Sequence, residues 1–278
     1  MNQESELHRD SHSGGMEVRE CASKSAIPIQ TVTYTYGNAN WKDQLTAYNG
    51  IPICYDEIGN PLNDGTWQYA WQAGRQLKSM SKIGTNIEYV YNAEGLRVRK
   101  MVNGVNSNYI LYGKNIVHMA QGTNSLHFFY DAQNRVTQVD FNGIRYGYLH
   151  NAHGDIIAIV DSSGGSVVEY VYDPWGKSIS KAGTLASTLG TLNPFRYRGY
   201  VFDEETNLYY LRSRYYNPEW GRFISPDALL GRVGALLSHN AYAYCNNNPV
   251  NMQDVSGKTA KLIFAKNDVF HETVTKAM

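Results

Sequence analysis

The stretch that decides the fold runs from Asn193 to Asp227 and reads NPFRYRGYVFDEETNLYYLRSRYYNPEWGRFISPD. Its aromatic and apolar residues lie on either side of two breaker segments, DEETN at 203–207 and NPEWG at 217–221. Residues of these types favour turns, whereas the segments between them have the composition of strands. The pattern therefore predicts three strands joined by two turns, which form a compact antiparallel sheet.

Strict alternation along the predicted middle strand, 208–216, assigns its residues to two faces. One face carries Leu208, Tyr210, Arg212, Arg214 and Tyr216, and the other carries Tyr209, Leu211, Ser213 and Tyr215. The two arginines then share a face with two tyrosines. Either the guanidinium groups stack on tyrosine rings in a purely structural sheet, or they line a site. Gly221, in the second breaker, is counted with these tyrosines and arginines as a structural residue of the core.

The segment RGYVFDEETNLYYLRSRYYNPEWGRFISPD closely resembles the core motif of RHS-repeat-associated proteins, also called YD-repeat proteins. This family comprises bacterial polymorphic toxins and toxin-complex subunits, and the resemblance covers about residues 31–257. It implies β-hairpin repeats that wind into a hollow shell around a C-terminal toxin cargo, in a secreted or contact-dependent system with an immunity protein. The predicted organisation is a weakly ordered lead (1–30), YD repeats (31–180), a linker (181–192), the RHS-associated core (193–257) and a truncated effector stub (258–278).

The repeats share one phrase, which is an aromatic residue, then Asp, Asn or Gly, two variable residues, and Gly or Asn. Clear copies begin at Tyr55, Tyr91, Tyr130 and Tyr172, and weaker copies at Tyr36, Trp71, Tyr112 and His150. Their spacing of roughly 16 to 22 residues marks a repeat architecture. Asp or Asn caps a turn and Gly accepts positive φ, so each unit is predicted to be a β-hairpin. Successive hairpins would form an all-β curved sheet. Because closed shells of the family use many more repeats than eight, we expect an open or partial shell with exposed edge strands.

Composition limits the classes of function. The 278 residues include 25 basic and 25 acidic side chains, so net charge offers no case for binding nucleic acid. The longest wholly apolar run, Ile156–Val160, is too short to span a membrane. Residues 1–15 lack a signal-peptide centre, so secretion or display at the cell surface would depend on a longer parent. Three cysteines and the pair His150 and His153 suggest neither a disulfide framework nor a metal site, and no cofactor is expected.

The candidate catalytic residues lie in the C-terminal part, where Asp227 and Asp254 each precede a glycine-bearing turn. Two neighbouring carboxylates that share one proton can activate water against a peptide bond. The alternative is that both aspartates cap turns or a helix N-terminus. Ser225-Pro226-Asp227 is a helix-start signal and predicts a short helix over about 226–237.

The resemblance also implies an activity, since the RHS core is an aspartic autoprotease that cuts after a motif resembling Asp-Pro-x-Gly-Leu. Carried over residue by residue, it gives Asp227 and Asp254 as the two acids, with Arg222 as a nearby basic residue. The cleavage region would be Gly257 and Lys258. The sequence departs from the family pattern at three positions, which are Ala228 and Val255 for the usual proline and Lys258 for leucine.

Three functions follow from these patterns. The chain is a scaffold or shell for an effector, a self-cleaving protease, or an extracellular module that binds carbohydrate or cell-wall polymer through its many tyrosines. The tail after Ala260 is about 18 residues long, too short for a stable domain, so no toxin activity is expected in it.

Overall fold

The computed structural model describes residues 31–228 and 239–263. The chain divides into two units, 1–32 and 33–278, and the helices and strands of the described residues belong to the second. Its described residues are nearly all β, with the short helix α1 (Leu189–Leu192) and two single 3₁₀ turns, η1 (Tyr197–Gly199) and η3 (Cys245–Asn247). This confirms the all-β prediction. The helix predicted over about 226–237 lies largely outside the described residues.

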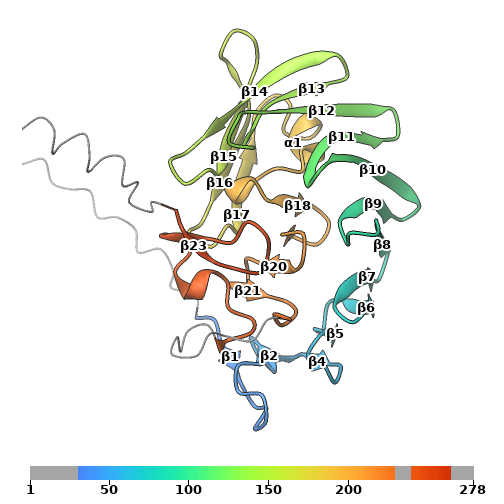
Figure 1. The fold of residues 1–278 in the computed structure, drawn as a ribbon, viewed down its shortest axis with the longest axis vertical. Helices are drawn as coiled ribbons and strands as arrows, with labels where there is room; N and C mark the ends of the chain where they lie inside the picture. The colour runs from blue at the N-terminus through green and yellow to red at the C-terminus, as the bar shows by residue number, and fades with distance from the viewer. Residues whose placement is uncertain (1–30, 229–238, 264–278) are drawn as a thin grey trace, which may run out of the picture. The chain divides into compact units, whose positions relative to one another are not determined.

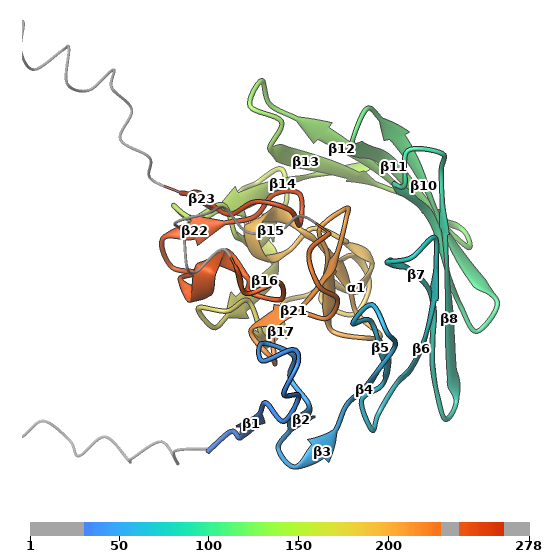
Figure 2. The ribbon, with the colours of Figure 1, turned by 60° about the horizontal axis from the view of Figure 1, so that its bottom comes forward.

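The largest element is a sheet of 14 strands in which each strand pairs antiparallel with its neighbours in sequence. Its strands are β4 (Cys54–Tyr55), β5 (Pro61–Asn63), β6 (Gln68–Gln72), β7 (Gln76–Lys82), β8 (Thr85–Tyr91), β9 (Arg97–Val102), β10 (Val105–Tyr112), β11 (Asn115–Gln121), β12 (Asn124–Tyr130), β13 (Val136–Phe141), β14 (Ile144–His150), β15 (Ile156–Val160), β16 (Ser166–Tyr172) and β17 (Ser178–Ala182). The sheet curves around the strands that follow it (Figures 1 and 2). Since β4 and β17 are the two ends of the pairing order, the sheet is open, as predicted for a partial shell.

The sequence repeats map onto every second turn of this sheet. The aromatic residue of each copy from Tyr55 onward lies at or next to the end of an even-numbered strand, from β4 to β16. Antiparallel strands alternate in direction, so these seven turns all lie at one edge, named here the YD edge. The eighth copy, at Tyr36, follows β1 (Tyr34–Thr35) in a separate sheet completed by β2 (Ala47–Tyr48) and β3 (Ile51–Pro52).

The turn chemistry explains why the phrase needs Asp or Asn. At Asp131, the side-chain Oδ1 accepts hydrogen bonds from the backbone N–H groups of Gln133 and Arg135, both at 2.9 Å. The residue between them, Asn134, has a φ of 59°. The same pattern recurs at Asp56, Asn92, Asn151, Asp161 and Asp173.

Several repeat tyrosines also donate hydrogen bonds through their hydroxyl groups. The Tyr130 hydroxyl donates a hydrogen bond of 2.7 Å to the carbonyl oxygen of Ile116, at the preceding repeat. Tyr55, Tyr91 and Tyr172 make equivalent bonds to Leu45, Leu77 and Ile156. A phenylalanine would fill the same space without this link between neighbouring segments, which accounts for part of the tyrosine excess.

The core sheet has four strands rather than the predicted three. They are β18 (Val201–Asp203), β19 (Leu208–Tyr210), β20 (Tyr215–Asn217) and β21 (Arg222–Phe223). The prediction of one strand over 208–216 is wrong because the chain reverses at 211–214, where Arg212 has a φ of 65°.

The reversal changes the assignment of faces. Tyr210 pairs with Tyr215, and both pack against residues of the long sheet such as Tyr89. Tyr209 pairs with Tyr216, and these two pack on the opposite side, in a cluster with Phe223 and Tyr244. Tyr210 and Tyr216 therefore do not share a face, contrary to the prediction from simple alternation.

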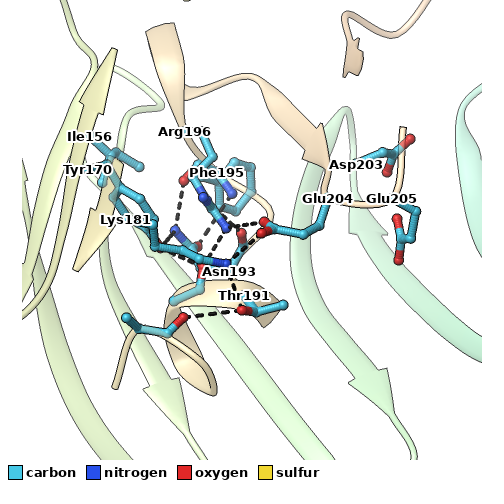
Figure 3. Close-up of polar contacts among 12 residues, drawn as sticks. Ile156, Tyr170, Lys181, Thr191, Asn193, Phe195, Arg196, Asp203, Glu204 and Glu205 are labelled. Atoms are coloured by element: carbon cyan, nitrogen blue, oxygen red, sulfur yellow. Dashed lines mark hydrogen bonds and ion pairs between the residues drawn. The ribbon is translucent and has the colours of Figure 1, made fainter. Parts of the chain in front are cut away.

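Ion pairs join the core to the long sheet. Asp203 is 0% exposed and forms ion pairs with Arg97 (2.6 Å) and Lys100 (3.2 Å) of β9. The next residue, Glu204, pairs with Lys181 of β17 (2.5 Å) and Arg196 (3.1 Å), as Figure 3 shows. The acidic turn thus contacts two distant strands of the curved sheet. Within the predicted linker, α1 contributes the fully buried Leu189 to the apolar core, so this segment packs as structure rather than acting as a loose connection.

Candidate functional site at Arg214

Asp227 and Asp254 come together on one guanidinium group. Nη2 of Arg214 lies 2.9 Å from Oδ2 of Asp227 and 3.8 Å from Oδ2 of Asp254. The side chains of Arg214 and Asp254 are buried, and Asp227 is largely buried. Burial lowers the pKa of Arg214 to about 10, although the two carboxylates act to raise it. Arg214 is therefore a cation at neutral pH, and its charge compensates the carboxylates beside it.

The predicted cleavage region lies against the same arginine. Nε of Arg214 donates a hydrogen bond to the carbonyl oxygen of Gly257, and the Ser213 hydroxyl donates one of 2.7 Å to the carbonyl of Ser256. Gly257 has a φ of 72°, and a Cβ there would lie 2.8 Å from Oγ of Ser213. Only glycine fits between this backbone and the 211–214 reversal. The Gly257–Lys258 peptide is thus held in place beside the two aspartates.

Asp254 belongs to a turn of the repeat type. Its Oδ1 accepts hydrogen bonds from the N–H groups of Ser256 and Lys258, both at 3.1 Å. This is the pattern of Asp173, which accepts from Trp175 and Lys177. Asp254 is therefore a turn cap, and its second carboxylate oxygen still faces Arg214.

The backbone of Asp227 is anchored separately. Its N–H donates a hydrogen bond of 2.8 Å to the carbonyl oxygen of Ala241. Its own carbonyl oxygen accepts one of 2.5 Å from Nη1 of Arg75, at the YD edge. These bonds fix the loop that carries the first aspartate.

Arg222 makes its contacts elsewhere. Its Nη1 lies 3.1 Å from the Tyr36 hydroxyl, its Nη2 donates to the carbonyl of Asp43 at 2.6 Å, and its guanidinium lies over the ring of Tyr242. The basic residue beside the two aspartates is Arg214. The alternation of residues along the predicted strand gave no indication of an acidic partner for it. Both aspartates and Arg214 lie in breaker-flanked segments, but their convergence depends on contacts that no local pattern encodes.

The other residues of the predicted core pack against neighbouring parts of the protein. Tyr209, Tyr210, Tyr215 and Tyr216 are at most 6% exposed, so they offer no open ring face for a sugar. Gly221 has a φ of 66° and lies against the ring of Trp175. Arg212 is partly buried at the 211–214 reversal.

Within residues 31–228 and 239–263, no group of three or more His, Cys, Asp or Glu side chains is arranged to hold a metal ion. No helix in the same ranges is long and apolar enough to cross a membrane.

Comparisons with known proteins agree with this fold. The family model of the Teneurin YD-shell matches residues 26–250. The chain is 40% identical over 231 residues to the tRNA3(Ser)-specific nuclease WapA of Bacillus spizizenii, an alignment that covers 81% of this chain and 10% of the relative. It is 33% identical over 120 residues to the toxin protein Tse5 of Pseudomonas aeruginosa, covering 43% of this chain and 8% of the relative. The chain thus spans about a tenth of these relatives.

Solved structures show the same fold. The TcdB2-TccC3-Cdc42 crystal structure aligns with a TM-score of 0.59 at 22% identity, covering 76% of this chain and 11% of that chain. TcdB2-TccC3 without its hypervariable C-terminal region aligns with a TM-score of 0.55 at 20% identity, covering 81% of this chain and 13% of that chain.

Proposed function

Since this chain belongs to the Teneurin YD-shell family, we propose that it forms part of the shell of an RHS-type bacterial toxin and helps to enclose a C-terminal effector. The observation that carries the proposal is the open, curved sheet of 14 strands, to which the core is joined by the buried ion pairs of Asp203 with Arg97 and Lys100. An open sheet is suited to be one segment of a longer spiral. The chain is 40% identical to the WapA nuclease, and the alignment covers 10% of that relative. This supports a role as one segment of a longer protein.

The partners in this proposal are those of the whole toxin. They are the effector that follows the core and the immunity protein that neutralises it. Secretion or display at the cell surface, including contact-dependent inhibition of neighbouring cells, belongs to the full-length system. The support for a toxin context is the similarity to WapA and Tse5.

A chimera tests the enclosure directly. Residues 26–250 replace the matching segment of the Bacillus spizizenii nuclease, and limited proteolysis follows the effector. If this chain is a shell segment, the effector remains protected from protease in the chimera as in the parent. An intact chimera whose effector is digested at the rate of free effector would contradict enclosure. A control chimera with the Asp203→Ala change, which removes the carboxylate partner of Arg97 in β9, is expected to lose protection.

A second candidate function is self-cleavage beside Gly257. It is favoured by one specific observation, which is that Arg214 contacts Asp227, Asp254 and the carbonyl of Gly257 together. Such a guanidinium orients both acids and polarises the neighbouring carbonyl, while a carboxylate activates water for attack on it.

The test restores the residues usual in the family. Ala228→Pro, Val255→Pro and Lys258→Leu are combined, and the intact mass is followed by mass spectrometry. Proteolytic function predicts loss of a C-terminal fragment of about 2 kDa, abolished by Asp227→Asn or Asp254→Asn because water activation needs a carboxylate. The Asp254→Asn change retains the turn, since Asn92 and Asn151 cap equivalent turns. An uncut, folded triple variant would leave both aspartates as structural partners of Arg214.

A further inference from the structure

Two adjoining cavities lie between the YD edge and the core. Their volumes are about 450 and 490 Å³, and they share Leu96, Lys114, Tyr210 and Arg212 as lining residues. Repeat turns from Ala73 to Gly154 form one wall. The other wall comes from the core, including the 211–214 reversal and the segment 253–258. Together the cavities form a trough that follows the YD edge, and we name it the edge trough.

The edge trough is basic. The first cavity is lined by the five cationic residues Arg97, Lys114, Arg135, Arg198 and Arg212, and by no Asp or Glu among the described residues. The second adds Arg75 and Lys258 against the single acid Glu94. Arg97, Arg135 and Arg198 have carboxylate partners in the protein. Lys114 and Arg212 have none within residues 31–228 and 239–263, so the trough presents cations without counter-charges.

Arg212 is the central residue of this surface because it lines both cavities. Its backbone lies in the left-handed region, which is costly for a long side chain. Its guanidinium forms neither a hydrogen bond nor an ion pair with the described residues. Burial lowers the pKa of Arg212, and the nearby Tyr130 and Tyr210 raise it only in part. A partly buried cation of this kind is stabilised when an anion binds it.

We propose that the edge trough binds an extended acidic peptide segment, with one carboxylate paired to Arg212. A guanidinium binds a carboxylate through two parallel hydrogen bonds. Leu111, Val201 and Val255 line the same space and are at least partly exposed, so they provide apolar contacts for alternate side chains of an extended chain.

The lining favours a peptide over a nucleic acid. Single-stranded nucleic acids bind by stacking bases on aromatic rings within a basic groove. Tyr200 and Tyr210 line the trough but are only 5% and 6% exposed. The partly exposed Tyr91 and Tyr130 also line it, and their rings pack against those of Tyr210 and Phe195. Lys114 and Arg212 are therefore available to an anion, whereas the tyrosine rings are largely covered by protein.

Fluorescence anisotropy tests this proposal on the intact chain. The probe is a labelled peptide that alternates glutamate and valine, compared with the same peptide carrying glutamine and with single-stranded RNA of equal charge. The test variant is Arg212→Asn, because asparagine tolerates the positive φ and removes the charge. Arg145→Asn is the matched control, since Arg145 is exposed in β14 and stacks on Phe129 away from both cavities.

The expected result is binding of the glutamate peptide that Arg212→Asn weakens by about tenfold, the size of one lost charge-assisted pair. The melting temperature should not fall, and Arg145→Asn should bind as the parent does. The proposal is overturned if the glutamate peptide does not bind, or if the glutamine peptide binds equally. It is also overturned if RNA binds more tightly or if the control variant loses as much affinity as Arg212→Asn.

Discussion

The long sheet and the core use the same residue types over different distances in sequence. In the sheet, Asp131 accepts hydrogen bonds from residues two and four positions later, and the Tyr130 hydroxyl reaches a carbonyl 14 residues earlier. In the core, Asp203 binds Arg97 across 106 residues, and the Tyr215 hydroxyl meets that of Tyr91 across 124 residues. The sheet is thus stabilised by contacts that are local in sequence, whereas the core is joined to the sheet by contacts that are distant in sequence.

The largest expected effect comes from breaking the buried ion pairs of the core. Asp203→Ala leaves Arg97 and Lys100 without their carboxylate partner in a site closed to water, and should lower the free energy of unfolding by about 3–5 kcal/mol. Urea denaturation measures this loss. The matched change in the sheet, Asp161→Ala at an exposed turn, should cost about 1 kcal/mol. Equal losses would show that the core is no more dependent on its acids than the repeats are.

The ion pairs of Asp203 with Arg97 and Lys100 also make the free energy of unfolding depend on pH. Burial opposes ionisation of Asp203, but the charges of Arg97 and Lys100 outweigh it and lower the pKa of Asp203 below its usual value of 3.8. The folded state then holds the proton less tightly than the unfolded state, so the stabilisation is complete above pH 3.8 and is lost as pH falls through the lower folded pKa. Urea midpoints of the parent and of Asp203→Asn should converge in this acidic range. A constant gap between them would contradict the assignment.

A smaller effect is expected from the hydroxyl links between repeats. Tyr130→Phe keeps the ring but removes the donor to Ile116, and should lower the free energy of unfolding by about 1 kcal/mol. Tyr112→Phe serves as the control, because Tyr112 is 81% exposed and should show no change. If both substitutions are neutral, the ring alone explains the tyrosine at these positions.

The smallest effect is expected from a substitution that makes the turn capped by Asp254 more like the turn capped by Asp173. Proline already occupies the second position of the turn at Asp173-Pro174, so Val255→Pro should fit the turn capped by Asp254. It should raise the free energy of unfolding by about 0.4–1 kcal/mol, because proline restricts the unfolded chain. Thermal melting of the single variant measures the gain. A loss would mean that contact with the 211–214 reversal has changed the backbone of the second turn.

The sequence predicted the long sheet because its signals are local. Asp or Asn followed by glycine or asparagine at a fixed offset specifies a turn through bonds within five residues, and five of the seven copies at the YD edge have this cap. The reversal at 211–214 could not be predicted in this way. Arginine is a poor signal for positive φ, and Arg212 adopts it where Gly257, distant in sequence, packs against the reversal.

The candidate site was predicted in part. The two aspartates were identified from glycine-bearing turns and from the family motif, and both lie at Arg214. The basic residue was assigned to Arg222 because Gly-Arg-Phe matches the family motif just before Asp227. In the folded chain Arg222 contacts the segment 36–43, whereas Arg214 reaches both carboxylates from the end of the reversal. The contact between Arg214 and the two carboxylates could not be predicted, because it is a tertiary contact between three segments.

The arrangement of the YD edge also constrains how such genes change in length. Each aromatic-Asp turn is separated from the next by two strands, so gain or loss of a whole unit leaves every remaining side chain on its original face of the sheet. Gain of a single strand would reverse the direction of all strands beyond it and move their capped turns to the opposite edge, away from the core. The two-strand period thus lets a shell of this type be lengthened or shortened by duplication and deletion within the reading frame.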